Sequence, residues 1–583
     1  MITFTKKMLN DPKNFIILFS TLFFAVHSLY FMHVFSVNTI LGDDFLFVPF
    51  VKSFVDGESF WTVSPFLQFD IHRLLIPNIL TLLSVELTQW NTIYLMMFGW
   101  CLIAISTFFI YLMLNKTDSR LRWLIIPISA MLFNPIQYGT MLWALPNNSY
   151  FLLVVGFVGA IYFLNKLHEN KFLLLPAIFF ATISTFSTFP GIIIWPIGVI
   201  SLLSFKKITK TPLILWVFST MMILSFFFID YSLPDSSNSF KHTNILDVFW
   251  SFFSKGFVNN VSLLEPLEFI VGSIVFFFIL FGPVFLKITH KNFSNFIPWI
   301  QFGFIGITLA IGFYMVITFT DNPTAVDSSR YGTFANFPQI SALIMITASM
   351  LFLYDRFKHD RKKIYILVLL FVLFLGLSSG LAVSYYIGWW HGFHMFQEHT
   401  QILNCLTKPN SDFLCFDHLY HDYIVENAKI LRELELGPFS EQEPFFDHSN
   451  DPLLNFLRVS IVGVPIQIDE RDFNEIKQNG TKWDYPTNKI LSYTSQLQIN
   501  LNTVHFNPEI ELSLDSGDVY SIKFYDGNEL LGRKIIYTEN YPQGLFSFNV
   551  KVPAEIIETG YDNIRIQPIN GDERFSVGHI ILK

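Results

Sequence analysis

Residues 364–388 read IYILVLLFVLFLGLSSGLAVSYYIG and contain no charged side chain. About 20 consecutive apolar residues are enough for a helix to cross the hydrocarbon core of a bilayer, so this run predicts a membrane span. The whole chain of 583 residues is 52% hydrophobic and only 14% charged, whereas soluble domains are about a quarter charged. This composition excludes an ordinary soluble enzyme and a disordered chain, and the net charge of −8 excludes a strongly basic nucleic-acid-binding protein.

Similar apolar runs recur along the first two thirds of the chain. We expect about 11 transmembrane helices, at residues 15–36, 92–114, 123–141, 149–165, 172–188, 190–205, 212–230, 266–286, 297–319, 337–354 and 364–388. The stretch 74–89 is also apolar, but it is short and contains Pro77, Asn78 and Glu86. We expect it to be an interfacial or re-entrant helix. The fold class is therefore a polytopic α-helical membrane protein.

Basic residues indicate the orientation, because the links that hold Lys and Arg stay on the cytoplasmic side. If the stretch 74–89 does not cross the membrane, the six basic links between spans all fall on one side and alternate with the acidic links. The basic residues of these links are Lys6, Lys7, Lys13, Lys116, Arg120, Arg122, Lys166, Lys171, Lys206, Lys207, Lys210, Lys287, Lys291, Arg356, Lys358, Arg361, Lys362 and Lys363. The sequence thus predicts an integral plasma-membrane protein with a cytoplasmic N-terminus and an extracytoplasmic C-terminal part. The first apolar run lacks a small-residue cleavage site after it, so we expect a retained anchor.

The charge changes sign along the chain. Residues 1–388 have a net charge of +5, and residues 389–583 have −13. We expect three parts: a transmembrane domain at 1–388, a helical extracytoplasmic linker at 389–455, and a soluble domain at 456–583. The linker contains a candidate helix at 420–436.

The last part has the alternation typical of strands. Tyr520, Ile522 and Phe524 alternate with polar residues before the turn sequence Asp526-Gly527-Asn528. Similar short runs with turn signals follow up to the C-terminus. Repeated short strands of this kind predict an antiparallel β-sandwich.

Two cysteines, Cys405 and Cys415, lie in the polar tail. An extracytoplasmic tail is an oxidising environment, so we expect a disulfide between them. The alternative is two unrelated buried thiols.

The acidic pair Asp43 and Asp44 follows the first span directly, at the membrane surface. A carboxylate beside lipid is costly unless it has a partner or a role. The structural alternative is a pair of solvated acids at a helix end. If the pair is functional, either acid could serve as a general base or bind a divalent cation such as Mg²⁺ or Mn²⁺.

Candidate cationic and polar groups for a phosphate occur in two other outer loops. The first loop ends in His72 and Arg73, and the loop before the tenth span ends in Arg330 and Tyr331. The guanidinium of Arg suits phosphate, because it presents a rigid fork of donors. The structural alternatives are interfacial side chains and a salt bridge from Arg330 to Asp327.

Motifs of soluble catalysis are absent from the sequence. It contains no Walker loop, GxSxG elbow, HExxH pair or CxxC pair. This argues against an ATP-driven pump and against a serine or zinc protease.

The order of elements resembles the GT-C class of integral-membrane glycosyltransferases, which includes protein O-mannosyltransferases, aminoarabinose transferases and oligosaccharyltransferases. The similarity covers about residues 1–388 and is carried by Gly42-Asp43-Asp44 after the first span, His72-Arg73 before a Pro-containing interfacial helix, and Ser329-Arg330-Tyr331 at a span entry. The chain has Asp-Asp where many members have Asp-Glu, and it lacks a WWD-type motif.

The resemblance implies that a first-loop acid is catalytic and that a polyprenyl-phosphate-linked sugar is the donor. The acceptor is a glycan, a lipid or a protein of the cell envelope. Because polyprenyl phosphate is a good leaving group, the reaction needs a base for the acceptor hydroxyl and positive charge for the departing phosphate. Attack from the face opposite the phosphate predicts inversion at the sugar carbon. The alternatives are a non-catalytic lipid or glycan transporter and a membrane-anchored carbohydrate-binding protein.

Overall fold

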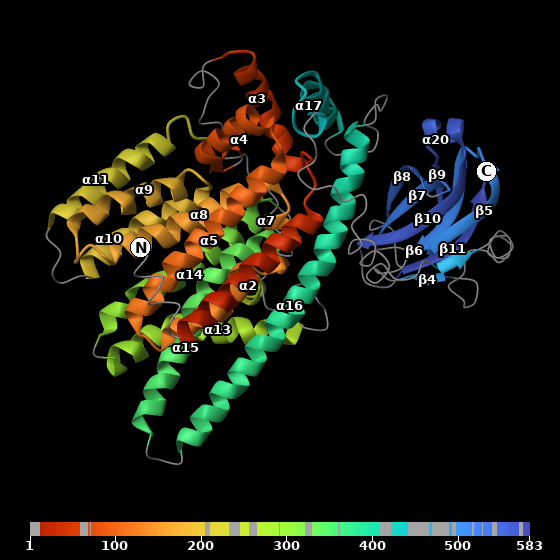
Figure 1. The fold of residues 1–583 in the computed structure, drawn as a ribbon. Helices are drawn as coiled ribbons and strands as arrows, with labels where there is room; N and C mark the ends of the chain where they lie inside the picture. Colours follow the sequence, from red (N-terminus) through yellow and green to blue (C-terminus); the bar gives the residue numbers. More distant parts are fainter. Residues whose placement is uncertain are drawn as a thin grey trace. The chain divides into compact units, whose positions relative to one another are not determined.

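The computed structural model describes residues 12–58, 68–69, 71–204, 210–232, 245–255, 265–290, 292–320, 329–358, 362–407, 421–440, 466–468, 489–491, 497–515, 518–527, 529–538, 545–570 and 575–583. The chain divides into two compact units (Figure 1). The helical unit comprises Met1–Pro409 and Asp422–Phe445, and the second unit comprises Asn410–His421 and Phe446–Lys583.

The helical unit consists of α-helices joined by short 3-10 helices. Its α-helices are α2 (Pro12–Phe35), α3 (Val48–Val55), α4 (Leu75–Thr88), α5 (Thr92–Thr117), α6 (Ile125–Leu132), α7 (Tyr138–Met141), α8 (Ala144–Leu164), α9 (Leu174–Thr185), α10 (Ile194–Ser204), α11 (Lys210–Phe227), α12 (Ile245–Ser254), α13 (Glu265–Thr289), α14 (Ile297–Thr320), α15 (Gly332–Arg356), α16 (Lys362–Thr407) and α17 (His421–Glu433). The 3-10 helices are η1 (Gly42–Phe47), η2 (Leu121–Leu124), η3 (Pro135–Gln137), η4 (Lys171–Leu173), η5 (Phe189–Ile193), η7 (Phe293–Phe296), η9 (Ser329–Tyr331) and η10 (Gly437–Phe439). A two-stranded pair, β1 (Gln68–Phe69) and β2 (His72–Arg73), precedes α4.

Eight helices in the described part of the chain are long and apolar enough to cross a membrane. They are Pro12–Phe35, Thr92–Thr117, Ala144–Leu164, Lys210–Phe227, Phe269–Thr289, Phe293–Tyr314, Ser329–Arg356 and Lys362–Phe396. Each overlaps an expected span, and the chain has the architecture of a polytopic helical membrane protein.

The other three expected spans are not single long helices. The helical segments Lys171–Thr185 and Phe189–Ser204 are shorter than a full span, and 123–141 is divided into α6, η3 and α7. The break in the last case follows from Asn134-Pro135. The Asn134 side chain accepts a hydrogen bond from the Ile136 amide (3.0 Å), and Pro135 has no amide proton to continue a helix.

Two helix boundaries also differ from the sequence expectation. Helix α8 begins at Ala144, before the expected start of this span at 149, and Pro146 lies in its first turn, where proline is tolerated. Helix α16 runs without a break across the expected boundary at 388/389 and ends at Thr407. The stretch 74–89 forms the short helix α4, and the helix expected at 420–436 is α17.

Ion pairs connect several of the segments between helices near the C-terminal end of α8. Lys116, in the last turn of α5, forms an ion pair with Glu169, which follows α8. Arg120 binds Asp355 near the end of α15 at 2.9 Å. The acid pair lies at the opposite end of α8, about 30 Å away for a helix of this length. The broken segment from η2 to α7 therefore connects the two ends of the bundle, although it is not one helix.

The second unit contains two sheets. Its elements are β3 (Ile466–Ile468), β4 (Lys489–Leu491), β5 (Leu497–His505), β6 (Glu509–Asp515), β7 (Val519–Asp526), β8 (Glu529–Tyr537), β9 (Leu545–Lys551), α20 (Ala554–Thr559), β10 (Tyr561–Asn570) and β11 (Phe575–Leu582). The strand orders are β3-β5-β10-β7-β8 and β4-β11-β6-β9. All pairs are antiparallel except β3 with β5.

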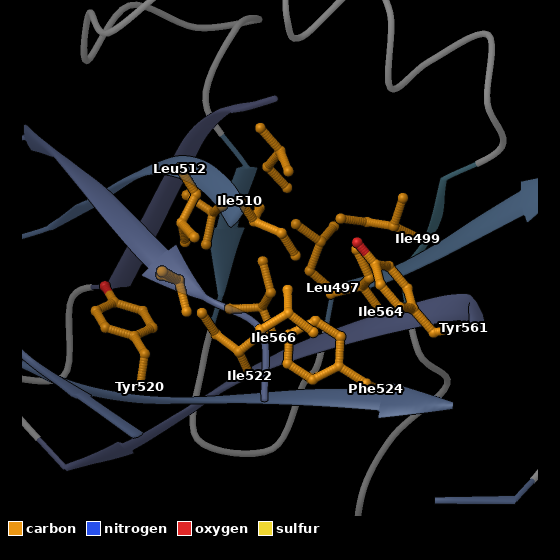
Figure 2. Packing of buried hydrophobic residues seen from close by; sticks show 14 of the residues in the cluster. Leu497, Ile499, Ile510, Leu512, Tyr520, Ile522, Phe524, Tyr561, Ile564 and Ile566 are labelled. Carbon is orange, nitrogen blue, oxygen red and sulfur yellow. The ribbon is translucent and has the colours of Figure 1, made fainter. Parts of the chain in front are cut away.

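Apolar residues from both sheets form one buried cluster (Figure 2). Ile522 and Phe524 come from the first sheet, and Leu512 and Ile580 come from the second. The expected alternation on β7 is confirmed, since Tyr520, Ile522 and Phe524 all belong to this cluster. The chain reverses after Asp526, which pairs with Glu529.

Candidate functional site

The acid pair lies on a tight turn that only glycine fits well. Gly42 has a φ of +37°, and a Cβ atom there would lie 3.1 Å from the ring of Trp143. Glycine carries no penalty in this left-handed region. The chain can thus pass close to Trp143 and enter η1, which carries Asp43 and Asp44.

Asp44 is the buried member of the pair, with 4% of its surface exposed. Its Oδ2 accepts hydrogen bonds from Trp143 Nε1 at 3.1 Å and from the Leu41 amide at 3.4 Å. Burial, and secondly the charge of Asp43, raise the pKa of Asp44 to about 8, although hydrogen bonds from Leu41, Trp143 and Leu145 act in the opposite direction. At neutral pH this carboxyl group is mostly protonated.

A small hollow opens beside the Asp44 side chain. It is lined by Asp44, Phe47, Pro77, Thr81, Trp90, Leu95, Ala144, Leu145 and Asn148. These residues come from η1, α4, α5, α8 and the link before α5. Thr81 and Asn148 add polar groups to its apolar walls, and among the described residues that line it Asp44 is the ionisable one.

Asp43 is the accessible member of the pair. Its side chain is 41% exposed, and its Oδ2 lies 4.0 Å from Arg330 Nη1. The Arg330 guanidinium also lies over two rings, 5.7 Å from the centre of Trp143 and 5.3 Å from that of Tyr331. The structure therefore brings together two loops that are almost 300 residues apart in the sequence.

Backbone contacts fix the position of Arg330. The Gly139 amide donates to Ser329 Oγ at 3.0 Å, and Thr140 Oγ1 donates to the Arg330 carbonyl at 3.1 Å. The Nε atom of Arg330 is buried and has no hydrogen-bond partner in the described part of the chain. One donor of Arg330 is thus unsatisfied among the described residues.

Tyr331 follows in the same 3-10 turn and packs in an aromatic group. Its ring centre lies 4.5 Å from that of Phe313 and 6.3 Å from that of Tyr150. The Arg330 guanidinium lies over the Tyr331 ring.

His72 is neutral in this structure. Its Nδ1 accepts a hydrogen bond from the Phe189 amide at 3.1 Å and lies 3.0 Å from Thr188 Oγ1. Because Nδ1 is an acceptor, the ring proton is assigned to Nε2. Burial, and secondly the charge of Arg330, lower the pKa of His72 to about 4. His72 can therefore donate one hydrogen bond but supplies no positive charge at neutral pH.

Arg73 makes different contacts from the other candidates. Its guanidinium donates to the Ile229 carbonyl and lies 5.8 Å from the ring centre of Tyr231. Through these two contacts Arg73 joins β2 to the segment after α11. A role of Arg73 in phosphate binding stays a prediction.

The arrangement does not fit a divalent cation held by the acid pair. Asp44 Oδ2 is already hydrogen-bonded to Trp143 and Leu41. Among the described residues, no group of three or more His, Cys, Asp or Glu side chains could hold a metal ion. We therefore derive no catalytic step through a metal.

The expected disulfide involves Cys415, which lies outside the described residues. The pairing of Cys405 with Cys415 stays a prediction, which mass spectrometry of non-reduced peptides can check.

Trp143 is the residue whose role the sequence did not reveal. It donates a hydrogen bond to Asp44 and lies against Gly42, and the Arg330 guanidinium lies over its ring. In the sequence it lies between the expected spans 123–141 and 149–165, and no spacing signal links it to an acid 99 positions away.

No known protein-family model matches the chain, and no curated protein is significantly similar to it in sequence.

Proposed function

We propose that this protein is a GT-C-like membrane glycosyltransferase that moves a sugar from a polyprenyl-phosphate-linked donor to an acceptor at the outer face of the membrane. The observation that carries the proposal is the distance of 4.0 Å between Asp43 Oδ2 and Arg330 Nη1, next to the buried carboxyl group of Asp44. A base and a phosphate-binding cation are the two groups that such a transfer requires.

We assign the base to Asp43 and not to Asp44. A base must reach the acceptor hydroxyl directly, and Asp43 is the more exposed carboxyl group. Asp44 is buried and mostly protonated at neutral pH, so it is a poor proton acceptor. Its role is to position the turn through Trp143 and Leu41.

The transfer then follows in one displacement. The acceptor hydroxyl gives its proton to the Asp43 carboxylate, and its oxygen forms a bond to the anomeric carbon. The bond from that carbon to the phosphate oxygen breaks, and the polyprenyl phosphate leaves with the electron pair. Arg330 stabilises the charge of this phosphate, and the Nε2 proton of His72 is a second donor. Attack opposite the leaving group inverts the sugar carbon.

The positions of the links support the membrane orientation that this reaction needs. Lys116, Arg120 and Lys166 lie at one end of α8, and the acid pair lies at the other. By the positive-inside rule, the acid pair is then extracytoplasmic. We propose 11 crossings, in which α9, α10 and the broken η2–α7 segment connect the two faces together with the eight long helices.

The second unit completes the proposed architecture. We interpret its two sheets, which share one apolar cluster, as an extracytoplasmic β-sandwich at about residues 456–583, with 389–455 as the connection. In this arrangement the domain belongs on the same side of the membrane as the acceptor.

A transfer assay with purified protein tests the proposal. The reaction contains a polyprenyl-phosphate sugar and a cell-envelope glycan acceptor, and it is run with and without a chelator. We expect Asp43→Asn to lower the rate by about 10²–10⁴-fold, the usual loss for a general base. Asp56→Asn is the matched control, because Asp56 is an exposed acid paired with Lys52 on the next helix.

The outcomes separate the alternatives. If Asp43→Asn transfers sugar at the parent rate, the assignment of the base is wrong. If the parent protein moves the lipid-linked sugar across vesicles without forming a new glycosidic bond, the protein is a transporter. Binding of glycan with neither activity would identify a carbohydrate-binding protein.

A further inference from the structure

A row of cations crosses the first sheet of the second unit. Lys523 on β7 is paired in register with Arg565 on β10 and with Arg533 on β8. Side chains at successive positions of a strand point to opposite faces of the sheet. Because Ile522 and Phe524 belong to the apolar cluster, Lys523 lies on the face away from it.

Lys523 is buried although it lies on this outward face. Only 8% of its surface is exposed, and its Nζ donates to Gln567 Oε1 at 3.2 Å. In the described part of the chain, the charged groups that act on it are the two arginines, and no carboxylate is paired with it. Burial and these like charges lower the pKa of Lys523 to about 8.

A buried cation without an opposite charge is costly for a folded domain. A protein usually compensates such a group with a carboxylate, and among the described residues Lys523 donates to the neutral amide of Gln567. A bound anion would supply the missing charge. The flanking Arg565 is only partly buried, so an anion can approach the row at this guanidinium.

The neighbouring groups suit a sugar. The Arg565 guanidinium lies 3.9 Å from the ring centre of Tyr525, and its Nε donates to Asn563 Oδ1 at 3.2 Å. The hydroxyl of Ser521, which is 2% exposed, has no hydrogen-bond partner in the described part of the chain. Ser521 is paired in register with Gln567, so an unused hydroxyl adjoins the lysine.

We propose that this outward face binds an anionic saccharide, with Lys523 and Arg565 holding its carboxylate or phosphate group and with Ser521, Asn563 and Gln567 holding its hydroxyls. Tyr525 keeps the Arg565 guanidinium in place by stacking. All of these residues belong to the second unit, so binding can be measured without a transfer reaction.

Binding measurements on the full-length protein in detergent test this site without any donor lipid. The probes are tri-galacturonic acid for a carboxylate, glucose 6-phosphate for a phosphate, and maltotriose as the neutral sugar. We expect at least one anionic probe to bind more tightly than maltotriose, and the stronger of the two identifies the acidic group. Added salt should weaken this binding.

Lys523→Gln and Arg565→Gln should each weaken binding of that probe by about tenfold or more, equivalent to one strong polar contact. Lys551→Gln is the matched control, because Lys551 is an exposed cation at the end of β9 in the other sheet. If Lys523→Gln does not fold, the partly exposed Arg565→Gln carries the test. The proposal is overturned if no anionic probe binds, if maltotriose binds equally well, or if the folded variants bind like the parent.

Discussion

The stability of the helical unit should depend on pH through Asp44. The pKa of its carboxyl group is about 8 in the folded protein, against an ordinary value of 3.8. Between these two values the folded state keeps the proton, while the unfolded chain loses it. The free energy of unfolding should therefore fall by about 1.4 kcal/mol for each pH unit from about pH 4 to pH 8. Above pH 8 both states are deprotonated and the dependence ends.

The substitution Asp44→Asn removes this dependence, because an amide carries no ionisable proton and has a similar size. The total difference between the two ends of the window is on the order of 5 kcal/mol. The stabilising effect of the substitution should thus increase as the pH rises. The assay is thermal or denaturant unfolding of the purified protein in detergent at several pH values between 5 and 9.

Asp43→Asn is the control for this experiment. It leaves Asp44 ionisable but removes the second cause of its raised pKa. The pH dependence should persist and should end at a lower pH. Parallel stability curves for the parent protein and Asp44→Asn would refute the assignment of a buried, protonated carboxyl group.

Three further predictions concern the same end of the bundle and the membrane orientation. Trp143→Phe removes the indole donor to Asp44 and should lower the stability of the helical unit by about 1–3 kcal/mol, measured by denaturant unfolding at pH 6. Arg330→Ala removes a phosphate contact and not the base, so it should raise the KM for the donor more than it lowers kcat; steady-state transfer kinetics check this. Reporter fusions after Lys171 and after Asn450 should lie on opposite sides of the membrane, and the same side for both would contradict the proposed topology.

The sequence was most informative where one local pattern decides the structure. A long apolar run such as 364–388 predicts a helix long enough to cross a membrane without reference to its neighbours, and α16 contains it. The alternation around Ile522 likewise predicted β7 and its buried face. The broken helix at Asn134-Pro135 was missed because hydropathy averages over the residues, whereas a single amide cap and a proline decide where the helix stops.

The site was only partly predictable for a related reason. The sequence identified Asp43, Asp44 and Arg330 as chemically suited residues, but it could not decide which acid is buried. That depends on Trp143, which approaches from a distant part of the chain. Nor could the sequence predict the contact of Arg73 with the Ile229 carbonyl, because that carbonyl lies 156 residues away along the chain.

The contact between η3–α7 and η9 has a consequence for how the site tolerates sequence change. A Cβ atom on Gly139 would lie 2.5 Å from Ser329 Oγ and 3.4 Å from the Arg330 amide. Any larger residue at 139 would displace the segment that carries the guanidinium. The distance between the Arg330 guanidinium and the acid pair thus depends partly on the absence of a side chain at Gly139, although Gly139 touches neither charge. A substitution of Gly139 would therefore change the geometry of the proposed site even though Asp43, Asp44 and Arg330 were themselves unchanged.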